Sequence, residues 1–214
     1  MTTSKTDLSD LFNRYGSDKD RNGYSSLYYT LFHTLRSNPV TLLEVGIGTM
    51  IENVPSSMLN YGLSGYAPGG SLRAWRDFFH EGRIMGFDVQ PDTQFENESR
   101  IETYLCDSTQ QKDVSKCIID IFGAEQNSGV YDIIIDDGLH TDTAQIKTLI
   151  NLWPYLKADG IYVIEDIYPS SNVSKHPRIL TEIVGDNVPI FFSGLQNNQC
   201  VIIKTVLNKK TTHF

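Results

Sequence analysis

Short apolar runs alternate with amphipathic stretches along most of the chain. The apolar runs are typical of buried strands and lie at 40–45, 84–89, 101–106, 131–135 and 160–164. The stretches between them carry apolar residues at helical spacing and lie at 71–79, 111–122 and 141–155. Strands separated by helices predict βαβ units, and hence a parallel sheet with helices on both faces.

The two ends of the chain depart from this alternation. Residues 1–38 predict a helical segment, because Leu8, Leu11 and Phe12 recur at helical spacing and a second helix is expected at 25–35. Near the other end, apolar runs at 188–192 and 200–203 flank a polar stretch, which predicts an antiparallel hairpin at one edge of the sheet. The pattern therefore predicts an α/β, Rossmann-like fold with a mostly parallel seven-stranded sheet.

The composition argues against several classes of protein. The chain has 214 residues, of which 40% are hydrophobic and 21% charged, as in one globular domain. Its net charge of −8 and pI of about 5.0 argue against nucleic acid as a partner, since phosphate neutralisation needs a basic face. We find no signal peptide and no apolar run long enough for a membrane span, and we expect a cytoplasmic protein with reduced cysteines at 106, 117 and 200.

Polar or glycine residues follow four of the predicted strands. In open α/β sheets, ligands bind outside the carboxyl ends of the strands. Any single acid there could simply cap a helix, but four successive strand ends of this kind predict a cofactor site. The expected cofactor contacts are Glu44, Gly46, Gly48, Ser71, Asp88, Asp107, Ser108 and Asp136.

The first glycine loop favours S-adenosylmethionine over a nicotinamide dinucleotide. Gly46 and Gly48 form a Gly-x-Gly motif, but the third glycine that packs the helix on the strand in dinucleotide sites is missing. We expect Gly69, Gly70 and Ser71 to form the helix entrance instead. The insertion at 50–70 is then either a flap over the site or a surface loop without a role.

A second polar cluster predicts metal-assisted chemistry. Asp137 follows one strand, Glu165 and Asp166 follow the next, and these three carboxylates are oxygen ligands of the type that Mg²⁺ prefers. His140 lies close enough in sequence to act as the general base, with Asp137, on a hydroxyl made acidic by the ion. Without a metal, the same acids would be a helix cap and a solvated strand end.

Five motifs resemble those of one enzyme family and lie at 15–19, 43–48, 69–75, 136–140 and 163–166. Together they resemble the metal-dependent sugar O-methyltransferases, which have the class I methyltransferase fold. The resemblance implies Mg²⁺ on Asp137, Glu165 and Asp166, with His140 as the base and 39–214 as the S-adenosylmethionine-binding domain. It also implies that residues 1–38 form a helical lid segment near the site. Leu139 replaces a serine that is often present in the family.

Three functions remain open from the sequence. The first is Mg²⁺-dependent methyl transfer from S-adenosylmethionine to a hydroxyl of a sugar, in a glycan, a nucleotide-sugar or a glycosylated natural product. The second is methylation of a catechol or another vicinal diol, and the third is a non-catalytic binding module with the same fold. For the enzyme we expect a homo-oligomer, either a dimer or a tetramer.

Overall fold

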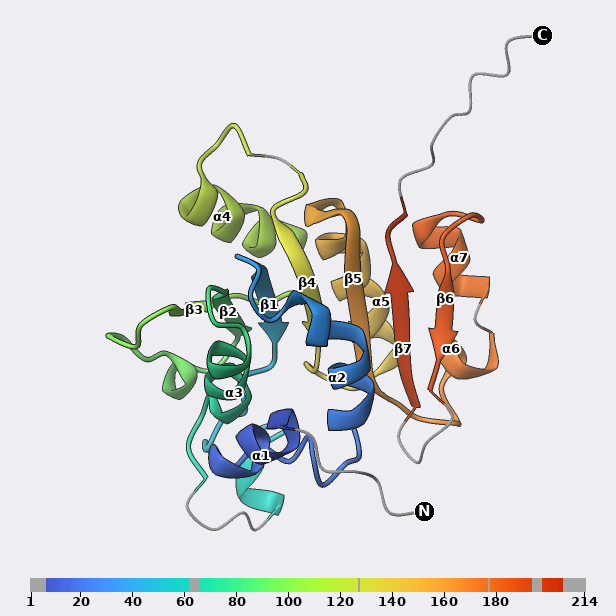
Figure 1. The fold of residues 1–214 in the computed structure, drawn as a ribbon. Helices are drawn as coiled ribbons and strands as arrows, with labels where there is room; N and C mark the ends of the chain where they lie inside the picture. Colours follow the sequence, from blue (N-terminus) through green and yellow to red (C-terminus); the bar gives the residue numbers. More distant parts are fainter. Residues whose placement is uncertain (1–6, 62–65, 127, 177, 194–197, 206–214) are drawn as a thin grey trace, which may run out of the picture.

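The chain forms a seven-stranded sheet in the order β3-β2-β1-β4-β5-β7-β6 (Figure 1). This computed structural model describes residues 7–61, 66–126, 128–176, 178–193 and 198–205. The strands are β1 (Thr41–Val45), β2 (Arg83–Asp88), β3 (Ile101–Leu105), β4 (Tyr131–Asp136), β5 (Leu156–Ile167), β6 (Ile190–Phe192) and β7 (Asn198–Ile203). Strands β1 to β5 pair in parallel, whereas β7 is antiparallel to both β5 and β6. The predicted hairpin at the sheet edge is confirmed.

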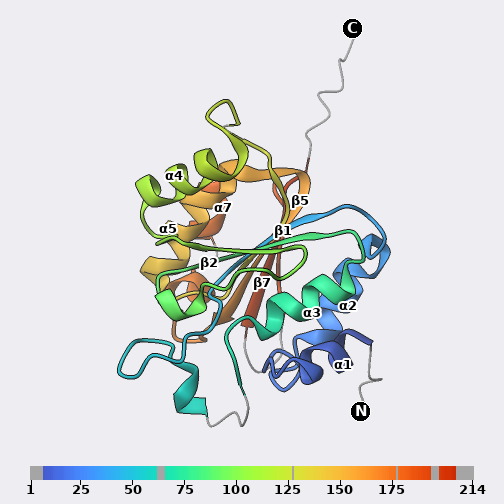
Figure 2. The same cartoon turned by 90° about the vertical axis from the view of Figure 1, so that its left-hand side faces the viewer.

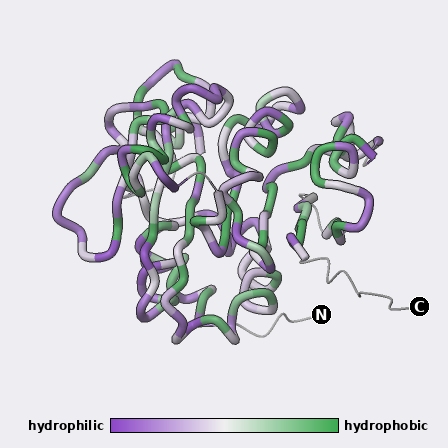
Figure 3. Tube along the Cα trace, turned by 90° about the horizontal axis from the view of Figure 1, so that it is seen from above, coloured by the Kyte–Doolittle hydropathy of each residue, from purple (hydrophilic) through white to green (hydrophobic). Residues whose placement is uncertain are grey.

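Helices cover both faces of the sheet, as Figure 2 shows. The helices are α1 (Asp7–Arg14), α2 (Ser25–Phe32), α3 (Gly70–Phe78), α4 (Gln111–Phe122), α5 (Asp142–Leu152), α6 (Asn172–Lys175) and α7 (Arg178–Val184). One hydrophobic cluster includes α4, α5 and α7, and the other includes α1, α2 and α3. Figure 3 shows hydrophilic and hydrophobic stretches interspersed along the chain trace. No helix among the described residues is long and apolar enough to cross a membrane.

Several element boundaries differ from the sequence prediction. The helix expected at 141–155 divides into α5 and the 3₁₀ helix η4 (Trp153–Tyr155), because Pro154 has no N–H to donate to a continuing helix. Strand β5 begins earlier and ends later than expected, with an irregularity in its pairing to β4. Helices α6 and α7 were not predicted from the pattern. The cysteines are free and buried, as expected.

The N-terminal helices belong to a core of aromatic side chains. Trp75 of α3 lies at its centre, with ring centroids 4.9 Å from Phe12 and 5.1 Å from Tyr28, both in edge-to-face geometry. These pairs prefer that arrangement because the positive edge of one ring meets the negative face of the other. Phe12, Tyr28 and Trp75 are fully buried, so α1 and α2 are fixed to the sheet through α3.

The strand register brings distant acids to one edge of the sheet. Val45 of β1 is paired with Asp136 of β4, and Asp136 is paired with Ile164 of β5. Asp137 directly follows β4 and Glu165 is the next residue of β5, so the two acids lie side by side. The order of the strands, rather than proximity in sequence, gathers the polar residues.

The aromatic core predicts a large stability effect at Phe12. Replacing Phe12 by Ala removes a fully buried ring and leaves a cavity beneath α1, so we expect the free energy of unfolding to fall by about 3–5 kcal/mol. Urea unfolding followed by circular dichroism measures this change.

Phe191→Ala is the matched control, because Phe191 on the edge strand β6 is 55% exposed. We expect it to change the free energy of unfolding by about 0.5 kcal/mol or less. An equal, small loss in both variants would mean that α1 is not part of the folded core.

Candidate active site

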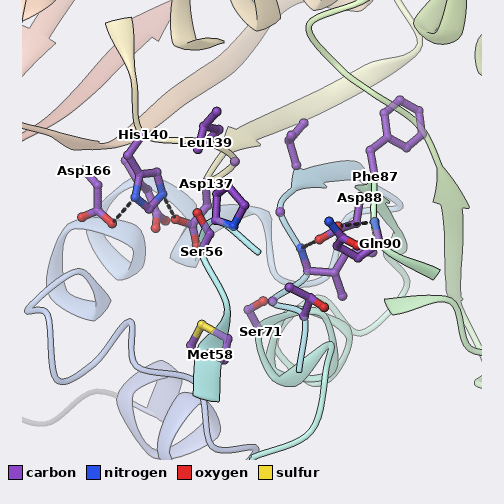
Figure 4. A pocket seen from close by; sticks show the side chains of 18 of the residues that line it. Ser56, Met58, Ser71, Phe87, Asp88, Gln90, Asp137, Leu139, His140 and Asp166 are labelled. Carbon is purple, nitrogen blue, oxygen red and sulfur yellow. Dashed lines mark hydrogen bonds and ion pairs between the residues drawn. The ribbon is translucent and has the colours of Figure 1, made fainter. Parts of the chain in front are cut away.

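A cavity of about 430 Å³ lies at the carboxyl ends of the parallel strands (Figure 4). This volume is within the range of sites for nucleoside-sized ligands. Ten of the predicted site residues line it, namely Gly46, Gly48, Ser71, Asp88, Asp107, Ser108, Asp137, His140, Glu165 and Asp166. The N-terminal segment also contributes to the lining through residues between α1 and α2, including Asp18 and Lys19.

The glycine loop after β1 permits two loops to touch. Gly46 has a φ of +88°, and a Cβ there would lie 2.0 Å from the carbonyl oxygen of Asp137. Only glycine accommodates both this backbone conformation and this contact. Gly46 therefore has a structural reason apart from any ligand: it lets the loop that carries Asp137 pack against the end of β1.

Asp88 is fixed at the end of β2 by backbone donors. Its two carboxylate oxygens accept hydrogen bonds from the N–H of Ile47 at 2.8 Å and from that of Gln90 at 2.9 Å. Burial raises the pKa of Asp88, although the backbone donors oppose the shift. Asp88 lines the cavity, so its carboxylate is an acceptor within reach of a bound ligand.

Two predicted cofactor residues lie beneath the cavity rather than in its lining. Glu44 is fully buried and accepts a hydrogen bond from the indole N–H of Trp75 at 2.8 Å. Asp136 is also buried, and its Oδ1 accepts a hydrogen bond from the N–H of Gly138 at 3.3 Å. Burial raises the pKa of Asp136 to about 7. Both carboxylates support the loops of the cavity, and direct contact with a cofactor stays a prediction for them.

Asp137, His140 and Asp166 form the group most suited to a metal ion. One potential ligand atom from each lies within 4.8 Å of the others. His140 Nε2 is 3.1 Å from Asp137 Oδ1, and His140 Nδ1 is 3.4 Å from Asp166 Oδ2 (Figure 4). Asp166 has a φ of +52°, a left-handed conformation that is uncommon outside glycine and is tolerated best by Asp and Asn. That backbone bend places its side chain beside His140 at the end of β5.

The charges of this group shift its pKa values strongly. Burial alone would lower the pKa of His140, but the hydrogen bond and charge of Asp137 and the charge of Asp166 raise it to about 9. Burial would likewise raise the pKa of Asp137, but Lys19 and His140 lower it to about 2. With these pKa values, His140 is a cation between two carboxylates near neutral pH.

Glu165, the third predicted metal ligand, turns toward the N-terminal segment. One carboxylate oxygen is 2.7 Å from Lys19 Nζ, and the other accepts a hydrogen bond from the hydroxyl of Tyr28. The hydroxyl of Tyr24, which also belongs to the N-terminal segment, donates a hydrogen bond to Asp166. The structure thus places Asp137 and Asp166 in one group with His140, while the role of Glu165 as a ligand stays a prediction.

Lys19 and Tyr28 are site residues that the sequence analysis did not identify. Lys19 lies in one of the motifs that resemble the sugar methyltransferases, but nothing in the pattern specifies its partners. Tyr28 lies within the helix expected at 25–35, where the pattern gives it no role in a site. A lysine in a turn rich in polar residues was the available signal, and its burial could be known only from the structure.

Apolar and aromatic side chains surround the opening near His140. Tyr61, Leu139 and Tyr168 all line the cavity, and each has between 47% and 53% of its surface exposed. Tyr61 comes from the insertion after β1, Leu139 from the loop after β4 and Tyr168 from the segment after β5. They form a partly apolar rim at the end of the cavity that contains Asp137, His140 and Asp166.

The sequence of the chain is similar to those of several O-methyltransferases. The chain is 33% identical over 173 residues to the demethylmacrocin O-methyltransferase of Streptomyces fradiae, covering 78% of the chain and 38% of that protein. It is 35% identical over 169 residues, with the same coverage, to the 8-demethyl-8-(2-methoxy-α-L-rhamnosyl)-tetracenomycin-C 3'-O-methyltransferase of Streptomyces olivaceus. The chain therefore spans well under half the length of these relatives. No protein-family model matches it.

A solved structure shows the same fold. The MycE methyltransferase of mycinamicin biosynthesis, in complex with Mg, S-adenosylhomocysteine and mycinamicin VI, has a TM-score of 0.72 at 23% identity. The alignment covers 97% of this chain and 57% of MycE. The chain therefore has the class I methyltransferase fold and is a homologue of the sugar O-methyltransferases of antibiotic pathways.

Proposed function

We propose that the chain transfers the methyl group of S-adenosylmethionine to a hydroxyl of a sugar on a glycosylated natural product, with Mg²⁺ as the metal. The observation that carries this proposal is the position of His140 between Asp137 and Asp166, inside a cavity that also contains Asp88. The names of the relatives support the substrate class, since they are O-methyltransferases of demethylmacrocin, of a rhamnosyl tetracenomycin and of mycinamicin VI.

The cavity residues near β2 and β3 suit the nucleoside part of S-adenosylmethionine. Asp88 is positioned at a strand end to accept hydrogen bonds from ribose hydroxyls. Asp107 and Ser108 lie at the end of the neighbouring strand, where an adenine would follow. The sulfonium of the cofactor supplies an electrophilic methyl group, and the acidic lining attracts its positive charge.

Asp137 and Asp166 would hold the magnesium ion, with Glu165 as the third candidate ligand. The donor set fits, because carboxylate oxygens are the ligands that Mg²⁺ prefers and Asp137 is already ionised through a pKa of about 2. When bound, a divalent ion supplies Lewis acidity that lowers the pKa of an alcohol. All three carboxylates line the cavity.

His140 is the residue placed to remove the proton of the acceptor hydroxyl. In its neutral form, one ring nitrogen donates its N–H to a carboxylate, which orients the imidazole. The other ring nitrogen faces the second carboxylate, and its lone pair would take the proton when the acceptor hydroxyl takes the place of that carboxylate beside the ring. The carboxylates then stabilise the imidazolium that forms. Tyr61, Leu139 and Tyr168 would contact the apolar face of the sugar or its carrier.

We further propose that the chain acts in the cytoplasm as a homo-oligomer. The free, buried cysteines support a reducing compartment. Size-exclusion chromatography with light scattering tests the oligomeric state, and a monomer at micromolar concentration rejects it.

Replacing His140 by Asn tests its role as the base. We expect kcat to fall by about 10²–10⁴-fold with little change in S-adenosylhomocysteine affinity, because the proton acceptor is lost and the nucleoside site is intact. In the unsubstituted chain, kcat should rise with pH as His140 loses its proton, because the neutral imidazole is the base, and this rise should be absent in the variant. Labelled methyl transfer measures the rate, and calorimetry measures the affinity.

His33→Asn is the control for this substitution, since His33 is exposed on the N-terminal segment and lies outside the cavity lining. It should keep the activity of the unsubstituted chain. Full activity of His140→Asn would remove the proposed base, and transfer only to a catechol in a panel of acceptors would reject the sugar.

Replacing Tyr168 by Ala tests the rim. We expect the KM for the sugar acceptor to rise about 2- to 10-fold, equivalent to ~0.5–1.5 kcal/mol of lost aromatic contact, while the KM for S-adenosylmethionine stays unchanged. Ile119→Ala is the control, because Ile119 is equally exposed but lies on α4. An equal rise in the KM for the sugar acceptor and the KM for S-adenosylmethionine in Tyr168→Ala would show that Tyr168 does not contact the acceptor specifically.

A further inference from the structure

Lys19 is a buried cation in contact with three acids. Its side chain is only 2% exposed, and its Nζ lies 2.6 Å from Asp137 Oδ2, 2.7 Å from Glu165 Oε2 and 3.1 Å from Glu44 Oε1. These acids come from the ends of β4, β5 and β1. A buried ammonium is stable only with close partners of opposite charge, and here the partners outnumber it.

The ammonium lies on the opposite side of Asp137 from His140. Oδ1 of Asp137 faces His140, whereas Oδ2 faces Lys19. Asp137 therefore separates two positions suited to cations: one beside His140 and Asp166, and one among Glu44, Asp137 and Glu165. Lys19 fills the second position.

The other donors to this second position cannot replace its charge. Tyr28 donates to Glu165, and Trp75 donates to Glu44, but both side chains are neutral. Without the ammonium, three carboxylates would face one another in a buried space. Such a cluster of oxygen ligands would itself attract a divalent cation.

We propose that Lys19 is a positioning residue that acts as an internal cation: it holds Asp137 and Glu165 together and occupies the place of a second metal ion. The site then binds one divalent ion rather than two, at Asp137 and Asp166 with Glu165 as the third candidate ligand. This inference rests on the proposed magnesium site and adds to it the reason for a single ion.

Counting bound Mn²⁺ ions in Lys19→Met tests the proposal. Met keeps the length of the stem but removes the charge. Titration of the full chain with Mn²⁺, followed by electron paramagnetic resonance of the free ion, should give one bound ion per chain for the unsubstituted protein and two for Lys19→Met. The variant should also have a lower melting temperature in EDTA, and Mn²⁺ should restore it.

Two further variants serve as controls. Lys19→Arg keeps a positive charge and should bind one ion. Lys157→Met removes a lysine whose ion pair with Asp132 lies outside the cavity, and it should also bind one ion with an unchanged melting temperature. One bound ion in Lys19→Met, together with an unchanged melting temperature in EDTA, would overturn the role of Lys19.

A double variant covers the case in which Lys19→Met does not fold. Adding Glu44→Gln removes one of the three facing charges, so Lys19→Met/Glu44→Gln should fold in the presence of Mn²⁺. If this double variant is also unfolded, packing of the lysine stem rather than its charge is required, and the proposal is wrong. An unsubstituted chain that binds no Mn²⁺ rejects the metal site itself, whereas one ion in every folded variant rejects only the internal cation.

Discussion

The compensation of negative charge at the carboxyl edge of the sheet is the constraint on which the site depends. The parallel register brings acids of β1, β4 and β5 together, and each is buried or partly buried. Like charges at this separation repel, and breaking one buried ion pair costs about 3–5 kcal/mol. Lys19 and the cationic form of His140 provide the compensation, one on each side of Asp137. These two side chains therefore offset much of the repulsion among the acids that the fold concentrates here.

The buried carboxylates of the site are also hydrogen-bonded to side chains of the aromatic core. Glu44 receives the indole N–H of Trp75, and Trp75 is the residue against which Phe12 and Tyr28 pack. Tyr28 in turn donates to Glu165. Packing and polar contacts thus share side chains, so the position of the carboxylates depends on how α1 and α2 dock on α3. The packing of the aromatic core therefore helps to hold the carboxylates of the site in position.

The sequence was sufficient to predict the fold and the acidic residues of the site, but not the side chains that contact those acids. Strand ends could be predicted because apolar runs stop at Asp88, Asp136 and Glu165, and parallel strands place such ends on one edge. Glu44 and Asp136 were expected in the cavity, yet whether a residue at a strand tip faces the ligand or the protein beneath depends on local loop conformation. The orientation of Glu165 depends on Lys19, whose position follows from the docking of helices far away in sequence. No local pattern encodes that contact.

The N-terminal segment is therefore part of the site and not only a cover for it. The predicted division at residue 38 remains a prediction about domains, but donors from before this point reach the acids after it: Lys19 to Asp137 and Glu165, and Tyr24 to Asp166. A lid moves away from a site that stays complete. Here, removal of the segment would leave Glu44, Asp137 and Glu165 without Lys19, so the site is incomplete without it.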